Sequence, residues 1–247
     1  MAIEDHTAMK VLKFGGAALE NLERVADLVV ENKAKCCQLV VVVSAMGDMT
    51  DHLLQLARDV HPNPPKREQD MLISVGERIS MALLAMALDK RGVKALSLTG
   101  SQSGVMTCTA HGEAEIVEVR TKRVQRHLDE GYVVIVAGFQ GVSLEGEITT
   151  LGRGGSDTTA VAVGAALGAE KVVFYKDVDG IYSSDPKEDV NAVCFEQLDY
   201  DDALPLCEKG GVVHPRAIRW AAKAQLPLHV SSFSKQGVGT TIASNSN

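Results

Sequence analysis

The sequence is poor in aromatic residues, basic clusters and long apolar runs, and each shortage limits the possible core, partner or location of the protein. Aromatic residues make up 4% of the 247 residues, so the core must be built from Val, Ala, Leu and Ile, which suit a sheet covered by helices on both faces. The formal net charge is −7 and no block of Lys or Arg stands out, which argues against a nucleic-acid partner. No apolar run approaches the roughly 20 residues of a membrane span, so we expect no membrane partner.

The five cysteines offer neither a disulfide framework nor a zinc site. Cys36 and Cys37 are adjacent, and no pair has the C-x-x-C spacing of metal and redox motifs. The segment Met1–Met9 is polar and lacks the apolar stretch of a signal peptide. We therefore expect reduced thiols and a cytoplasmic protein.

Apolar runs and helical spacings alternate along the chain. The runs predict strands at residues 11–14, 39–43, 95–99, 132–137, 171–175, 227–230 and 240–243. The spacings predict helices at residues 19–30, 51–60, 68–91, 121–130, 158–167, 199–209 and 215–224. Residues 101–113, rich in Ser, Thr and Gly, predict an irregular or hairpin excursion. Such a βα series indicates an α/β fold, a three-layer α/β/α sandwich with a mostly parallel central sheet.

The first segment with chemical potential is a predicted strand that ends in Lys13 and Phe14 and runs into Gly15 and Gly16. Glycines let backbone N–H groups approach an anion, and the N-terminus of a following helix adds partial positive charge. Lys13 at the strand end could then reach a phosphate. The alternative is a tight turn with a surface lysine, and the segment alone leaves both open, because the Walker pattern is absent.

A second segment, residues 152–160, places three glycines, Arg153, Asp157 and three hydroxyl residues directly before a helix of small residues. Ser156 or Asp157 could cap that helix. A cap explains one polar residue and leaves Arg153 and the glycines without a reason, so the pattern favours a binding role.

Three further segments are ambiguous. Residues 44–51 follow a buried strand, the place where open α/β sheets bind ligands. Glu77 lies among apolar residues of a predicted helix, and its position alone favours a solvated face over a ligand contact. In the turn-rich loop 177–189, Tyr182 could flank a base and Lys187 could reach phosphates; the alternative is a surface loop built from turn-forming residues.

Taken together, the segments resemble the aspartate kinases of the amino acid kinase family. The matching stretches, in the family's order, are KFGG at Lys13, SAMGDMTD at Ser44, GERIS at Gly76, AGFQG at Ala137, LGRGGSDTTA at Leu151, DVDGIYSSDPK at Asp177 and HPRAI at His214. The resemblance implies ATP-dependent phosphorylation of the β-carboxylate of L-aspartate, giving β-aspartyl phosphate and ADP in amino-acid biosynthesis. It implies ATP and Mg²⁺ as cofactors, with Mg²⁺ carried by ATP and no metal ligand assigned to the protein.

The resemblance also implies roles for individual residues. Lys13 and Asp157 would be catalytic. The residues expected to bind aspartate are Thr50, Glu77, Arg153, Gly154, Gly155 and Ser156. Glu77 would pair with the α-ammonium of aspartate, and Arg153 would bind its α-carboxylate. The residues expected to bind ATP are Lys13, Gly15, Gly16, Ser44, Gly47, Asp177, Tyr182 and Lys187.

Some features depart from the family pattern. Ala17 and Ala18 stand where the family usually has Thr and Ser, and Met49 replaces a residue that is often Thr. These changes leave open a same-fold kinase that acts on another small acid, or a catalytically weak regulatory subunit.

The expected domain organisation also differs from that of the family. We expect a tail at 1–8 and one catalytic domain at 9–247, with an acceptor lobe at about 9–150 and a nucleotide lobe at about 151–247. The ACT regulatory domains common in the family are not expected within this sequence, and a natural catalytic-only protein and a piece of a longer one both remain open. We expect a homodimer or an ACT-bearing partner.

Overall fold

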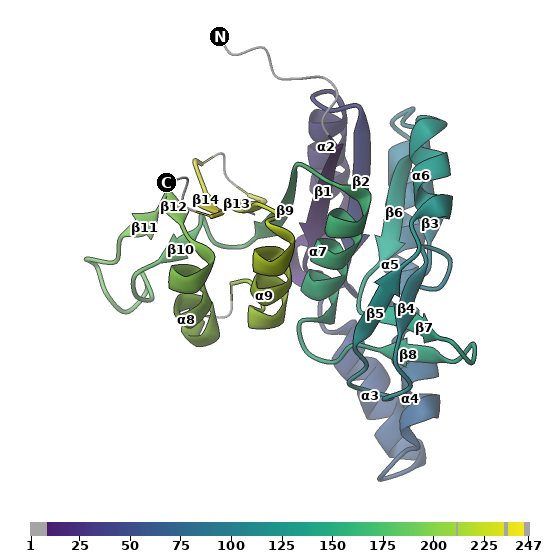
Figure 1. Cartoon of the computed structure of the whole chain (residues 1–247). Helices are drawn as coiled ribbons and strands as arrows, with labels where there is room; N and C mark the ends of the chain where they lie inside the picture. Colours follow the sequence, from purple (N-terminus) through teal and green to yellow (C-terminus); the bar gives the residue numbers. More distant parts are fainter. Residues whose placement is uncertain (1–8, 211, 235–236, 245–247) are drawn as a thin grey trace.

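An eight-stranded sheet forms the centre of the protein (Figure 1). The structure is a computed structural model that describes residues 9–210, 212–234 and 237–244, so the expected tail at 1–8 lies outside the described residues. In spatial order the strands are β12 (Gln197–Leu198), β14 (Thr240–Ile242), β13 (Leu228–Ser232), β9 (Lys171–Lys176), β1 (Met9–Phe14), β2 (Gln38–Val43), β6 (Val133–Ala137) and β3 (Ala95–Leu98). All neighbours are parallel except β13 and β14, which confirms the mostly parallel sheet.

Helices cover both faces of this sheet, as the apolar strands require. On one face lie α1 (Gly16–Leu19), α2 (Leu22–Lys33) and α5 (Val75–Asp89); on the other lie α6 (Lys122–Asp129), α7 (Gly155–Leu167), α8 (Tyr200–Gly210) and α9 (Pro215–Ala224) (Figure 1). Successive residues of a strand point to opposite faces. The odd-numbered residues of β2 therefore join the core with α2 and α5, and Val40 and Val42 join the core with α7 and α9. The predicted three-layer architecture is confirmed.

A smaller sheet lies beside the lower end of the central one (Figure 1). Its order is β5 (Ile116–Val119), β4 (Val105–Thr107), β7 (Gln140–Ser143) and β8 (Ile148–Thr150). Of the predicted excursion at residues 101–113, only β4 forms a strand; it pairs antiparallel with β5, which lies beyond the predicted bounds. β7 and β8 were not predicted, because they are short and lack a long apolar run. Two-residue strands β10 (Ile181–Tyr182) and β11 (Cys194–Phe195) also form a small pair.

The helix predicted at 68–91 is interrupted. It consists of α4 (Lys66–Ile73) and α5, which meet at Ser74, and α3 (Met49–Val60) packs against both. The Ser74 carbonyl accepts a hydrogen bond of 2.7 Å from the Gln140 side chain, which ties the junction to β7. Among the described residues, the stretch 66–89 has the length and the apolar composition of a helix that could cross a membrane. Asp70 and Glu77 are nevertheless buried within it and bonded to other elements, as expected for a helix pair of the protein's own core.

Candidate active site

The carboxyl ends of four neighbouring parallel strands meet at one edge of the central sheet. Phe14 at the end of β1 pairs with Val43 of β2 and Tyr175 of β9, and Val43 pairs with Ala137 of β6. The loops that follow these strands therefore begin at the same level. This edge is where open α/β sheets bind their ligands.

A cavity of about 510 Å³ lies at this edge. It brings together most of the residues predicted from the sequence: Lys13, Gly16, Ser44, Gly47, Thr50, Glu77, Arg153, Gly154, Gly155, Ser156 and Asp157. It is also lined by residues to which the sequence assigned no individual role: Ala45, Phe139, Gly152 and Lys176.

Lys13 and Asp157 form a buried ion pair at the floor of the cavity. The Lys13 ammonium lies 2.7 Å from Asp157 Oδ1, and each residue is only 5% exposed. Lys176 Nζ lies 3.4 Å from Asp157 Oδ2, and the His214 backbone N–H donates to the same oxygen at 3.1 Å. The surface-lysine interpretation of Lys13 is therefore wrong.

This cluster carries two ammonium groups against one carboxylate. Burial opposes ionisation of Asp157, but the charges of Lys13 and Lys176 outweigh it and hold the pKa of this carboxyl far below its usual range. Burial and the neighbouring Lys13 charge lower the pKa of Lys176, and Asp157 partly offsets them. With Lys13 and Lys176 protonated, the cluster has an excess positive charge facing the cavity, which suits an anionic ligand such as a phosphate.

Glu77 lines the same cavity and has one unpaired carboxylate oxygen. Its Oε1 accepts a hydrogen bond of 3.1 Å from the Ala45 N–H, whereas Oε2 is buried and has no hydrogen-bond partner among the described residues. Burial raises the pKa of Glu77 to about 7, against the opposing effects of the Ala45 N–H and the Lys13 charge. The solvated-face interpretation is thus wrong, because Glu77 is 3% exposed. A buried, unpaired carboxylate oxygen in a polar cavity is suited to a cationic group of a ligand.

The glycine-rich segment forms the opposite wall and starts α7. Gly154, with φ of 73°, is the N-cap residue, and no side chain of the residues that the structure describes caps the helix, so the capping interpretation of Ser156 and Asp157 is wrong. A Cβ atom on Gly154 would overlap the His214 ring. Phe139, itself at a φ of 67°, packs against Gly155. The N-terminus of α7 thus faces the cavity and adds partial positive charge.

Other predicted nucleotide residues lie outside this cavity. Gly15 precedes α1, and a Cβ placed on it would lie 3.7 Å from Lys13 Nζ. Asp177 and Lys187 are exposed, and the Lys187 N–H donates to Asp185 Oδ1 at 2.9 Å. Tyr182 lines a separate cavity of about 260 Å³.

Sequence reasoning missed Lys176 and the contact of the His214 N–H. A signal for Lys176 was present: like Lys13, it is a lysine at the carboxyl end of a predicted buried strand. The sequence showed His214 only as part of a stretch that matches the family, with no role of its own. Across the described residues, no group of three or more His, Cys, Asp and Glu side chains is placed to hold a metal ion.

Comparison with known proteins settles the family. The amino acid kinase family profile matches residues 8–232. The chain belongs to the amino acid kinase family.

Aspartokinases are among the relatives of this amino acid kinase, which confirms the resemblance seen in the sequence segments. It is 51% identical over 236 residues to the aspartokinase of Geobacillus stearothermophilus, covering 94% of this chain and 58% of that protein. It is 50% identical over 241 residues to the aspartokinase of Corynebacterium glutamicum, covering 96% and 57%. The chain therefore spans less than two thirds of the length of these curated relatives.

Solved structures of aspartate kinases are also similar to this chain. The aspartate kinase from Synechocystis superposes with a TM-score of 0.86 at 42% identity, over 97% of this amino acid kinase and 40% of that chain. E. coli aspartokinase III in complex with aspartate and ADP superposes with a TM-score of 0.86 at 27% identity, over 97% and 65%.

Proposed function

We propose that this chain transfers the γ-phosphoryl group of ATP to the β-carboxylate of L-aspartate, giving β-aspartyl phosphate and ADP. One observation carries the proposal: Glu77, which has a buried and unpaired carboxylate oxygen, and Arg153 line the same cavity as the cationic cluster around Lys13. An acceptor with an ammonium group and two carboxylates matches this distribution of charge. The aspartokinase relatives, and the aspartate and ADP held by the E. coli enzyme, favour the same acceptor.

In the proposed complex, aspartate is recognised through its charges. Glu77 Oε2 would accept hydrogen bonds from the α-ammonium, and Arg153 would bind the α-carboxylate through its planar guanidinium, which suits bidentate contact. The hydroxyls of Thr50 and Ser156, both lining the cavity, would complete the polar shell. This would leave the β-carboxylate free to face the cationic cluster.

The chemistry needs no strong general base, because the β-carboxylate is ionised at neutral pH. One of its oxygens attacks the γ-phosphorus as the bond from that phosphorus to the bridging oxygen breaks, and ADP leaves with the electron pair. Negative charge spreads over the phosphoryl oxygens in the transition state. Lys13, Lys176 and the N-terminus of α7 would stabilise that charge, and Asp157 would hold both ammonium groups in place.

The nucleotide would approach from the loop after β1. Gly15, Gly16, Ser44 and Gly47 would line its phosphates through backbone N–H groups, and Asp177, Tyr182 and Lys187 would contact the rest of it. Mg²⁺ would arrive on ATP as a counter-ion of its phosphates. Asp157 is already engaged by two lysines and a backbone N–H, so we assign no protein ligand to the metal.

The wider biology is proposed on the same grounds. We place the enzyme in the cytoplasm and in amino-acid biosynthesis, with aspartate and ATP as its small-molecule partners. We also propose a homodimer or an association with an ACT-bearing chain, and the division into an acceptor lobe and a nucleotide lobe.

The direct test is ADP release with Mg·ATP and an acceptor panel of aspartate, glutamate, N-acetylglutamate and UMP. If the true acceptor is one of the three carboxylic acids, hydroxylamine should trap its acyl phosphate as a hydroxamate; UMP would give UDP, which forms no hydroxamate. We expect aspartate to be preferred by tenfold or more, and Arg153→Ala to raise the KM for aspartate far more than that for ATP. Turnover with another acid and not with aspartate would point to the same-fold alternative; no turnover with any acceptor would point to a regulatory subunit.

A further inference from the structure

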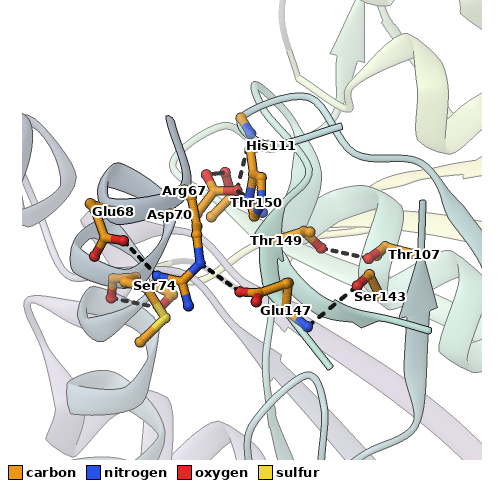
Figure 2. A network of polar contacts seen from close by, with 12 residues as sticks. Arg67, Glu68, Asp70, Ser74, Thr107, His111, Ser143, Glu147, Thr149 and Thr150 are labelled. Carbon is orange, nitrogen blue, oxygen red and sulfur yellow. Dashed lines mark hydrogen bonds and ion pairs between the residues drawn. The ribbon is translucent and has the colours of Figure 1, made fainter. Parts of the chain in front are cut away.

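Asp70 is a fully buried carboxylate that lies outside the catalytic cavity and joins three separate parts of the chain (Figure 2). Its Oδ2 accepts hydrogen bonds from His111 Nδ1 at 2.8 Å and from the Gly112 N–H at 3.1 Å. The Thr150 N–H donates to Oδ2 at 3.1 Å, and the Thr150 hydroxyl donates to Oδ1 at 2.6 Å. A carboxylate with this many well-placed donors fixes the backbone on which they sit.

The backbone fixed in this way leads into the substrate loop, which we define as residues 152–156. The Thr150 carbonyl accepts from the Ala114 N–H at 2.9 Å. Leu151 is held at both ends, since its N–H donates to the Phe139 carbonyl at 2.9 Å and its carbonyl accepts from Arg216 Nη1 at 2.8 Å. The next residue is Gly152, the start of the loop that carries Arg153.

A second contact reaches the same place from the other side. A Cβ atom on Gly152 would lie 3.1 Å from the Gly112 carbonyl oxygen, so the segment that Asp70 holds through the Gly112 N–H also backs the substrate loop. At the other end of β8, Arg67 of the same helix donates to Glu147 at 2.8 Å (Figure 2). Helix α4 therefore contacts β8 just before its first residue, through Glu147, and at its last residue, Thr150.

The helix that carries Asp70 also leads to Glu77. The two carboxylates are seven residues apart, two helical turns, on the helix pair α4–α5. Asp70 points to β8 and the loop at 111–112, and Glu77 points to the end of β2 and the cavity. One helix pair thus links both walls of the acceptor site.

We propose that Asp70 is a positioning residue that sets the spacing between Glu77 and the substrate loop bearing Arg153. This inference rests on the proposed function, because those two residues are the pair assigned to the ammonium and carboxylate of the amino acid. Asp70 itself does not line the cavity. It acts on acceptor recognition by holding the entry of the substrate loop against the helix that presents Glu77.

The test compares Asp70→Ala with Asp70→Asn and with the milder Thr150→Val. The alanine removes all four contacts. An asparagine can direct its oxygen to the three N–H donors and its amide to the Thr150 hydroxyl, so it should rescue most of the loss. The matched control is Thr149→Val, one residue away on the same strand, whose buried hydroxyl pairs at 2.5 Å with Thr107 (Figure 2).

Two readouts separate positioning from a general structural role. We expect Asp70→Ala to raise the KM for aspartate about tenfold or more, while the KM for ATP stays within about twofold. The reason is that a displacement of about 1 Å in a positioning group can lower the reaction rate about a hundredfold. We also expect faster amide hydrogen exchange at Leu151 and Gly155, whose N–H groups are hydrogen-bonded, and no change along β1.

The exchange readout needs no substrate. If the wild-type chain does not phosphorylate aspartate, the proposed function fails and exchange still decides the role of Asp70. Unchanged exchange at Leu151 and Gly155 in folded Asp70→Ala would overturn the inference. If that variant does not fold, Thr150→Val decides: faster exchange at these two amides than in Thr149→Val supports it, and identical behaviour of the two valine variants rejects it.

Discussion

Lys13 and Asp157 come from opposite halves of the chain and meet as a buried ion pair, with Nζ 2.7 Å from Oδ1. Lys13 ends a central strand and Asp157 lies in the first turn of the helix that crosses behind it. The pair therefore ties the phosphate-facing loop after β1 to the glycine-rich wall of the cavity.

Replacing Lys13 should abolish most of the activity. We expect Lys13→Ala to lower kcat with Mg·ATP and aspartate by roughly two to three orders of magnitude, the usual cost of losing one group that stabilises transition-state charge. Lys10→Ala is the matched control, because Lys10 lies on the same strand and is also buried but does not line the cavity. ADP release measures both variants. A loss below tenfold for Lys13→Ala would contradict the assigned role.

The same pair should show strong coupling in stability. Asp157→Asn leaves two ammonium groups facing each other, and Lys13→Met leaves Asp157 with Lys176 as its remaining cation. Breaking a buried pair by removing one partner typically costs about 3–5 kcal/mol. In urea unfolding at pH 7, the double variant should be less destabilised than the sum of the two single variants. Additive losses would show that the two side chains do not interact energetically.

Aspartate binding should depend on pH through Glu77. The carboxylate of Glu77, with a pKa of about 7 in the free protein, must be ionised to pair with an ammonium group. Affinity should therefore rise from pH 6 to pH 8, by about tenfold, because only about a tenth of Glu77 is ionised at one pH unit below its pKa. Calorimetry at pH 6 in two buffers should detect proton release on binding. Glu77→Gln should bind more weakly with a flat pH profile between pH 6 and 8; a profile as steep as that of the wild type would assign the titration to another group.

The stability of the free protein should respond to the same group with the opposite trend. A carboxyl whose pKa is raised on folding, here from 4.5 to about 7, favours the folded state below pH 4.5, and that contribution is lost as the pH rises through 7. The free-energy difference between Glu77→Gln and wild type should thus shift in favour of the variant between pH 4.5 and 8. The change should be on the order of 2–3 kcal/mol. Urea unfolding at both pH values measures it, and a constant difference would show that Glu77 is not desolvated.

Gly154 offers a test of the glycine-rich wall. Gly154→Ala and Gly168→Ala both place alanine at a positive φ, 73° and 69°, at a cost of roughly 1–2 kcal/mol each. At Gly154 the new methyl group would also overlap the His214 ring, whereas no atom in the described part of the chain lies within 4 Å of a Cβ on Gly168. We expect comparable backbone strain in both variants. Gly154→Ala should lose more stability than Gly168→Ala, and only Gly154→Ala should have a lower kcat. Equal activity of the two variants would mean that the contact between Gly154 and His214 does not support the site.

The sequence alone determined the layers of the fold and the region of the site. Apolar runs of β-branched residues can be buried on both faces only in a sheet covered by helices, so the central strands and most helices were predictable. Lys13 was visible as a candidate, although a tight turn with a surface lysine stayed open. The glycine-rich segment favoured a binding role, because a helix cap explains only one of its polar residues. The short strands β7 and β8 carried no comparable signal.

The tertiary structure decided which polar groups are buried and what they contact. Helical periodicity gives the faces of a helix but not its neighbours, so it could not show that Glu77 is buried with one unpaired oxygen. The partners of Asp70 lie in loops and strands remote in the sequence, so the residues next to Asp70 in the sequence could not predict them. Lys176 joins Lys13 only because β9 lies beside β1 in the sheet. Charge and hydrogen bonding act over a few ångströms in space, and chain packing alone sets which groups come that close.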